Sequence, residues 1–159
     1  MITEEELGEI RSYLKKAENP LVFFDADHDG LTSYILLKKN FEKINGVIVK
    51  CGMREEEIYY RKIEEYKPDF IFVLDRGEIS QDLIDSVNVP LIWIDHHPVI
   101  NRKGVKYFNP RIHNKKDNRS VSYWCYKLVK NNLWLAMVGI IGDYYVPEFI
   151  DEFKYKELL

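Results

Sequence analysis

A chain of 159 residues with 46% hydrophobic and 31% charged side chains has the composition of one globular domain, long enough to bury most of its apolar surface. Its net charge of −3 argues against non-specific binding to long nucleic acid, which usually requires a basic surface. The longest apolar stretch, Leu133 to Ile141, is too short for a membrane span, which needs ~20 such residues.

The chain shows no sign of secretion or of stable disulfides. The N-terminal sequence MITEEELGEI is acidic and lacks an apolar signal core, as cytoplasmic proteins do. Cys51 and Cys125 form neither a C-x-x-C pair nor a disulfide-rich pattern. We therefore expect a reduced, cytoplasmic protein with no membrane partner.

Helical and strand patterns alternate along the chain. Helices are predicted at residues 3–17, 32–43, 55–66, 80–87 and 120–130. Strands are predicted at residues 21–24, 46–50, 70–74, 90–94 and near 106–109. The first strand is apolar throughout, as expected for a strand covered on both faces. This alternation predicts an α/β fold, with helices on both faces of a mostly parallel five-stranded sheet.

We expect a single domain over residues 1–159. An N-terminal helix lies within residues 1–19, and a core at 20–145 carries every motif of interest. The tail at residues 146–159 contains enough Phe, Ile and Leu to pack as a closing segment or helix.

Acids and histidines of the kind that hold metal ions occur where apolar segments end. They are Asp25, Asp27 and Asp29 after the strand at 21–24, Asp75 after 70–74, Asp95, His96 and His97 after 90–94, and Asp143 after LAMVGIIG. In a parallel sheet, residues just past the carboxyl ends of the strands share one crevice. Each pair of crowded carboxylates costs about 4 kcal/mol near a protein surface unless cations neutralise it. The sequence therefore predicts a metal site, with all four sets at strand ends.

The types of ligand indicate which ion would bind. If strand geometry persists past residue 24, alternation puts Asp25, Asp27 and Asp29 on one side, and Gly30 then permits a tight turn. Carboxylates suit Mg²⁺ or Mn²⁺, and imidazoles shift the preference toward Mn²⁺ or other transition metals such as Co²⁺. Alternation also separates His96 from His97, so that one binds metal while the other reaches a substrate phosphate. Asp95 would orient an imidazole.

Alternative roles for these acids fit the sequence less well. Asp-x-Asp-x-Asp-Gly also opens an EF-hand calcium loop, but the twelfth position should be Glu and is Leu36. A phosphatase whose aspartate becomes phosphorylated would leave the Asp-His-His sequence without a role. Asp75 alone is also typical of a strand-ending turn, with Arg76-Gly77 after it.

Basic residues are concentrated between residues 101 and 119. Seven Lys and Arg residues lie there against one acid, a local balance of +6. Such a segment is either a solvated loop or a site that captures phosphate.

At these motifs the chain resembles the DHH phosphoesterase family, which includes RecJ-type exonucleases, nanoRNases, cyclic-dinucleotide phosphodiesterases and family II pyrophosphatases. Four motifs occur in the family's order: FFDADHDGLTS, VLDRG, IDHHP and GIIGDYY. The three-Asp first motif is most similar to the RecJ-like branch. The stretch Phe108 to Arg111, followed by Ser120 to Tyr123, resembles archaeal RecJ-like proteins.

The resemblance implies a role for each site residue. Asp25 and Asp27 would hold one Mn²⁺, and Asp29, His96 and Asp143 a second, with Asp75 bridging both. His97 would contact the scissile phosphate, with Asp95 supporting it. Further phosphate oxygens would bind to Arg111, His113 and Arg119.

The implied activity is Mn²⁺-dependent hydrolysis of phosphodiester bonds, with two ions clamping the phosphate and activating water. The substrate would be a single-stranded DNA or RNA end or a short oligonucleotide, whose bases could stack on Tyr59, Tyr60 or Tyr107. One alternative is a non-catalytic or partner-dependent subunit of a replication or repair complex. Another is a small-molecule phosphatase or pyrophosphatase.

One departure from the family concerns the C-terminal side. Active members carry a second, substrate-binding domain there, and the sequence after Asp143 has no equivalent. We expect that the chain is a fragment, that a second subunit completes the cleft, or that the protein acts alone on short substrates.

Overall fold

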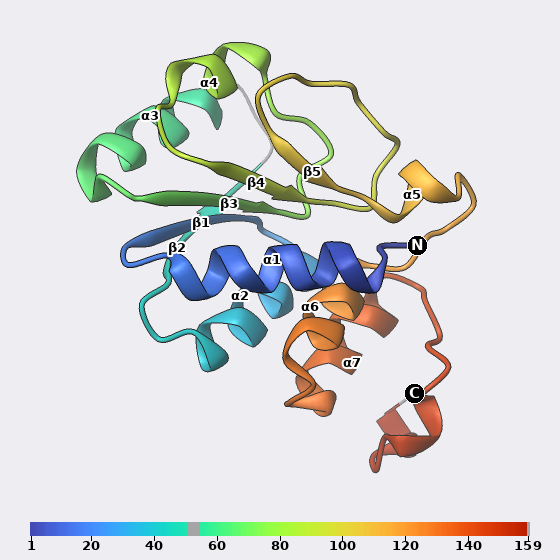
Figure 1. Ribbon diagram of the computed structural model, residues 1–159. Coiled ribbons are helices and arrows are strands. Elements are labelled where there is room, and N and C mark those ends of the chain that lie inside the picture. The colour runs from blue at the N-terminus through green and yellow to red at the C-terminus, as the bar shows by residue number, and fades with distance from the viewer. Residues whose placement is uncertain (51–54, 159) are drawn as a thin grey trace.

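The computed structural model describes residues 1–50 and 55–158 and shows one parallel sheet between two layers of helices (Figure 1). The strands are β1 (Pro20–Asp25), β2 (Asn45–Val49), β3 (Phe70–Leu74), β4 (Leu91–Ile94) and β5 (Lys106–Phe108). Their order is β2-β1-β3-β4-β5, and every neighbouring pair is parallel. The predicted α/β fold with a parallel five-stranded sheet is confirmed.

Alternating strand residues build two separate cores. In β1, Val22 and Phe24 face one layer, whereas Leu21 and Phe23 face the other. The first layer consists of α1 (Glu4–Lys16), α2 (His28–Asn40), α6 (Val121–Val129) and α7 (Leu133–Gly142). The second consists of α3 (Glu55–Tyr66) and α4 (Gln81–Ser86). Because both faces are covered, the central strands are apolar throughout.

Local capping explains where the first helices begin. Thr3 and Glu6 form a capping box at the start of α1, as the sequence predicts. Helix α2 begins at His28, four residues earlier than predicted, because the Asp27 side chain accepts a hydrogen bond from the Gly30 amide (2.9 Å) and caps the helix.

The C-terminal third differs most from the prediction. The apolar run that ends at Asp143 is helix α7, so the expectation that the fourth motif follows a strand is wrong. A short apolar run has no periodicity that separates a buried helix from a buried strand. The structure also adds a short helix, α5 (Pro110–His113), and two 3₁₀ turns at Ile150–Glu152 and Lys156–Leu158.

Helices α2, α6 and α7 pack at very short range. A Cβ on Gly139 of α7 would lie 2.0 Å from Thr32 Oγ1 and 2.6 Å from Ser122 Oγ, and one on Gly142 would lie 1.9 Å from the His28 ring. Glycine is required at position 139, because Thr32 and Ser122 are buried there and cannot move away, whereas the exposed His28 ring could rotate away from a Cβ at position 142. Asp29 and Asp143 are therefore held in fixed relative positions.

Of the two cysteines, Cys125 is a buried free thiol, whereas Cys51 lies outside the described residues. Within the described part of the chain, no helix is both long enough and apolar enough to span a membrane.

Candidate metal centre

Four segments far apart in the sequence meet at the carboxyl edge of the sheet. Asp75 follows β3 with a left-handed backbone (φ 58°), and His96 lies two residues beyond β4. Asp29 lies in the first turn of α2, and Asp143 is the C-cap of α7. His96 Nε2 is 3.4 Å from Asp75 Oδ1, 3.4 Å from Asp143 Oδ2 and 4.0 Å from Asp29 Oδ2.

These atoms form two overlapping sets of possible metal ligands. Asp29, His96 and Asp143 each offer an atom within 4.8 Å of the others, and so do Asp75, His96 and His97. The expectation that His96 and His97 lie on opposite faces is wrong, because β4 ends at Ile94 and strand alternation ends with it.

Asp75 provides a direct test of whether a cation fits. Its side chain is 1% exposed, and neither carboxylate oxygen has a hydrogen-bond partner among the described residues. Burial and the neighbouring carboxylates of Asp29 and Asp27 raise the pKa of Asp75 to about 10. An unpaired buried carboxylate is costly, and a divalent ion among oxygen and imidazole ligands would remove that cost. The donor set therefore fits a divalent cation, Mn²⁺ among them.

Asp29 is held from two sides. Its oxygens accept hydrogen bonds from the amides of Val121 and Ser122 at the start of α6, both at 2.7 Å. Its side chain is fully buried, and this burial raises the pKa of Asp29 in spite of those hydrogen bonds. Each carboxylate oxygen has a second lone pair, so Asp29 can cap α6 and still bind an ion.

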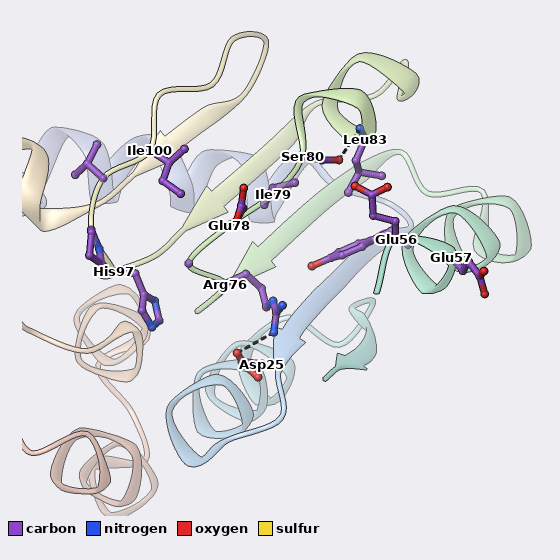
Figure 2. Close-up of a pocket in the computed structure, with 14 residues that line it drawn as sticks. Asp25, Glu56, Glu57, Arg76, Glu78, Ile79, Ser80, Leu83, His97 and Ile100 are labelled. Atoms are coloured by element: carbon purple, nitrogen blue, oxygen red, sulfur yellow. Dashed lines mark hydrogen bonds and ion pairs between the residues drawn. The ribbon is translucent and has the colours of Figure 1, made fainter. Parts of the chain in front are cut away.

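The first two aspartates of the motif lie differently. Asp27 caps α2 and is near enough to raise the pKa of both Asp75 and Asp143, although burial is the main cause for each. Asp25 forms an ion pair with Arg76 (Oδ2 to Nη1, 2.9 Å), which Figure 2 shows. The expectation that strand alternation aligns all three acids is wrong, because α2 begins at His28.

Arg76 is a site residue that sequence reasoning treated only as part of a turn. It is 5% exposed and also donates to the Val49 carbonyl (3.4 Å). The only sign of its role in the sequence is its position, because a basic residue directly follows the acid that ends a strand. Its pairing with Asp25 depends on tertiary structure.

A buried network holds His97. Asp95 is fully buried and accepts hydrogen bonds from the His97 amide (3.1 Å), Tyr107 Oη (3.0 Å) and Asn109 Nδ2 (3.1 Å). Its other oxygen lies 2.7 Å from His97 Nδ1, and this contact raises the pKa of His97. Sequence reasoning missed Asn109, and it considered Tyr107 only as a surface on which a base could stack.

The three expected phosphate-binding residues differ in their surroundings. Arg111 lines a cavity of about 560 Å³. His113 Nε2 lies 3.0 Å from Glu6, and Arg119 pairs with Asp117 while lying over the rings of Tyr123 and Trp124. The last two therefore already have protein partners.

The three tyrosines considered for base stacking also differ in their surroundings. Tyr59 is buried against Phe23, with ring centroids 4.6 Å apart. Tyr60 is partly exposed on α3. Tyr107 lines the same cavity as Arg111.

A second, larger cavity of about 940 Å³ borders the metal centre (Figure 2). Asp25, Arg76 and His97 line it on the side of the sheet edge. Three acids, Glu56, Glu57 and Glu78, line it elsewhere.

Comparison with known proteins agrees with this geometry. The profile of the DHH family, N-terminal domain, matches residues 20–147, which include every candidate ligand. The chain belongs to the DHH family. No curated protein matched it.

Solved structures share the fold at low sequence identity. RecJ in complex with Mn²⁺ from Thermus thermophilus is 19% identical, with a TM-score of 0.64 over 86% of this chain. Exonuclease RecJ bound to manganese is 20% identical, with a TM-score of 0.61 over 82%. CDC45 from Entamoeba histolytica is 18% identical, with a TM-score of 0.61 over 89%. This DHH chain covers only 22%, 37% and 33% of those three chains, respectively.

Proposed function

We propose that residues 1–159 form a single domain that hydrolyses phosphodiester bonds with Mn²⁺, acting on single-stranded DNA or RNA ends or short oligonucleotides as a RecJ-like nuclease. The observation that carries this proposal is the buried carboxylate of Asp75, which accepts no hydrogen bond from the described residues and faces His96 beside Asp29 and Asp143. Both manganese-containing RecJ structures share this fold. Mg²⁺ and Co²⁺ are alternative ions for the same ligands.

The metal ligands have distinct roles in this proposal. Asp29, His96 and Asp143 would hold one ion, Asp25 and Asp27 would hold a second, and Asp75 would be a ligand of both. Bound ions would polarise phosphate oxygens and acidify water. The Asp25–Arg76 ion pair (2.9 Å) competes with the second ion for Asp25, so the guanidinium must share or release that carboxylate.

Substrate contacts come from the neighbouring residues. Asp95 fixes the orientation of the His97 ring, which contacts the scissile phosphate. Arg111 binds a further phosphate oxygen through charge-assisted hydrogen bonds. His113 and Arg119 can join only if they leave Glu6 and Asp117.

The partners and location are also part of the proposal. A second subunit, or further chain, supplies the substrate-binding half of the cleft. The protein works in the cytoplasm, where a free buried thiol such as that of Cys125 stays reduced.

A second candidate function is a non-catalytic subunit of a replication or repair assembly. The shared fold of CDC45 supports it. The clustered ligands favour catalysis, because a scaffold has no need of buried acids and histidines gathered within ligand distance of one another. A small-molecule phosphatase or pyrophosphatase is a third candidate.

The test is an assay with added Mn²⁺ on 5′- and 3′-labelled single strands, short oligonucleotides, pyrophosphate and cyclic dinucleotides. We expect cleavage of the single strands or oligonucleotides, and no cleavage by Asp75→Asn. Asp82→Asn, at an exposed acid in the first turn of α4, is the matched control and should remain active. If no substrate is cleaved while Mn²⁺ is bound, hydrolysis by this chain alone is excluded, and the non-catalytic or partner-dependent function takes its place.

A further inference from the structure

The smaller cavity differs in charge from the larger one. Its lining includes the cations Arg102, Arg111 and Lys115, and no carboxylate among the described residues. The larger cavity is lined by four carboxylates, those of Asp25 and three glutamates, against one guanidinium, that of Arg76, and the His97 ring. A phosphate group would be attracted to the smaller cavity and repelled from most of the larger one. At about 560 Å³ it also falls in the ~300–1,000 Å³ range of small-molecule sites.

Arg111 is the cation best placed to receive an anion. Its Nε is buried without a hydrogen-bond partner among the described residues. The Asn109 side chain accepts a hydrogen bond from the Arg111 amide (2.9 Å) and so fixes the start of α5. Arg102, in contrast, is occupied by the Ile79 carbonyl (2.7 Å) and by Glu78 (3.2 Å). A guanidinium matches the geometry of phosphate oxygens.

Tyr107 gives the cavity a rigid aromatic surface. Its ring is stacked on Trp93, with centroids 4.0 Å apart and planes at 18°. Its hydroxyl donates to Asp95 (3.0 Å), so the ring is fixed at both its face and its tip. Val99 and Ile112 add exposed apolar walls. A flat base can stack on such a surface irrespective of its identity.

The cavity is physically joined to the metal centre. Residues 98–100, which directly follow His97, line both cavities. Tyr107 and His97 are also hydrogen-bonded to the same carboxylate, that of Asp95. A nucleotide in the smaller cavity would therefore place its neighbouring phosphodiester close to His97.

We propose that this cavity binds one nucleotide of the substrate, with its phosphate on Arg111 and its base on the ring of Tyr107. This inference rests on the proposed hydrolase function and narrows it. The substrate is a nucleotide chain with at least one nucleotide beyond the scissile bond. Pyrophosphate, which has no base, would leave most of the cavity empty.

The test measures binding without metal and without turnover. Deoxyadenosine 5′-monophosphate, inorganic phosphate and deoxyadenosine are titrated into the ¹⁵N-labelled full chain, and the indole N–H signal of Trp93 and the amide of Arg111 are followed by NMR. We expect the monophosphate to bind at least about tenfold more tightly than either part alone, because it uses both contacts.

Variants separate the two contacts. Arg111→Met should raise the Kd of the monophosphate about tenfold or more and leave that of deoxyadenosine unchanged. Tyr107→Leu should weaken the binding of both ligands. Ile112→Glu should weaken the binding of the monophosphate, and it leaves the core intact because the Ile112 side chain is 49% exposed. Lys106→Met is the matched control, because Lys106 pairs with Glu9 (3.1 Å) and does not line the cavity.

The outcomes distinguish this inference from the hydrolase proposal. Equal Kd values in the wild type, Arg111→Met and Ile112→Glu would overturn the nucleotide site and leave metal-dependent hydrolysis standing. Intact monophosphate binding in a protein that holds Mn²⁺ but cleaves nothing would overturn hydrolysis by this chain alone and leave the nucleotide site standing.

Discussion

Within one motif, three aspartates of similar sequence context lie in three different environments. Asp25 pairs with Arg76, Asp27 caps α2, and Asp29 is buried against the first turn of α6. Residue type and spacing could predict that a metal binds near them. The pairing of Asp25 could not be predicted, because Arg76 lies 51 positions away and no local pattern links the two.

The difference between Asp25 and Asp29 can be measured as metal content. We expect the wild type to bind two Mn²⁺ ions and Asp25→Asn to lose only the ion assigned to Asp25 and Asp27. Asp29→Asn should weaken binding of the other ion, assigned to Asp29, His96 and Asp143, by more than about 100-fold. Calorimetric titration and elemental analysis of the dialysed protein give the stoichiometry. A wild type that binds one ion at saturation would show instead that the Arg76 guanidinium takes the place of the second cation.

Among the secondary-structure elements, the strands were predicted best. Their continuous apolar runs arise directly from burial on both faces. Helix α7 lacks such a signal, because it is apolar on nearly every side and short. Helix α5 is a single turn fixed by the Asn109 side chain, and so its place depends on a network that the sequence does not display.

Packing among α2, α6 and α7 should control the metal centre. Gly139→Ala would force a Cβ against Thr32 and Ser122, and we expect it to destabilise the fold by about 1–3 kcal/mol and to weaken Mn²⁺ binding, because Asp29 and Asp143 would be displaced. Denaturant unfolding and a Mn²⁺ titration measure the two effects.

Gly8→Ala is the matched control for that substitution. Gly8 lies inside α1 with no atom within 4 Å of an added Cβ. Alanine there should stabilise the protein by about 0.5–1 kcal/mol and leave metal affinity unchanged. Unaltered Mn²⁺ binding in Gly139→Ala would show that helix packing does not position the ligands.

For the whole molecule, the buried acids couple stability to pH. Burial, with Asp29 and Asp27, raises the pKa of Asp75 to about 10, so the folded state binds this proton more tightly than the unfolded state. Its contribution to stability is complete below the ordinary carboxyl pKa, and it is lost as pH rises toward about 10. The pKa of His97, raised by Asp95, acts in the same direction.

We therefore expect the melting temperature of the metal-free protein to fall between about pH 6 and about pH 8. Mn²⁺ should reduce this fall, because the ion replaces the proton on Asp75. In the metal-free protein, Asp75→Asn should remove most of this fall in melting temperature. Differential scanning calorimetry measures all three, and an identical pH profile in Asp75→Asn would assign the effect to other groups.

The carboxylate of Asp29 joins the ligand cluster to the amides of Val121 and Ser122. The Asp29 carboxylate would bind the metal ion while it accepts hydrogen bonds from the first amides of α6. Metal binding should therefore change the protection of those amides. Hydrogen–deuterium exchange at those two amides should slow when a divalent ion enters, which would make them a reporter of loading that requires no substrate.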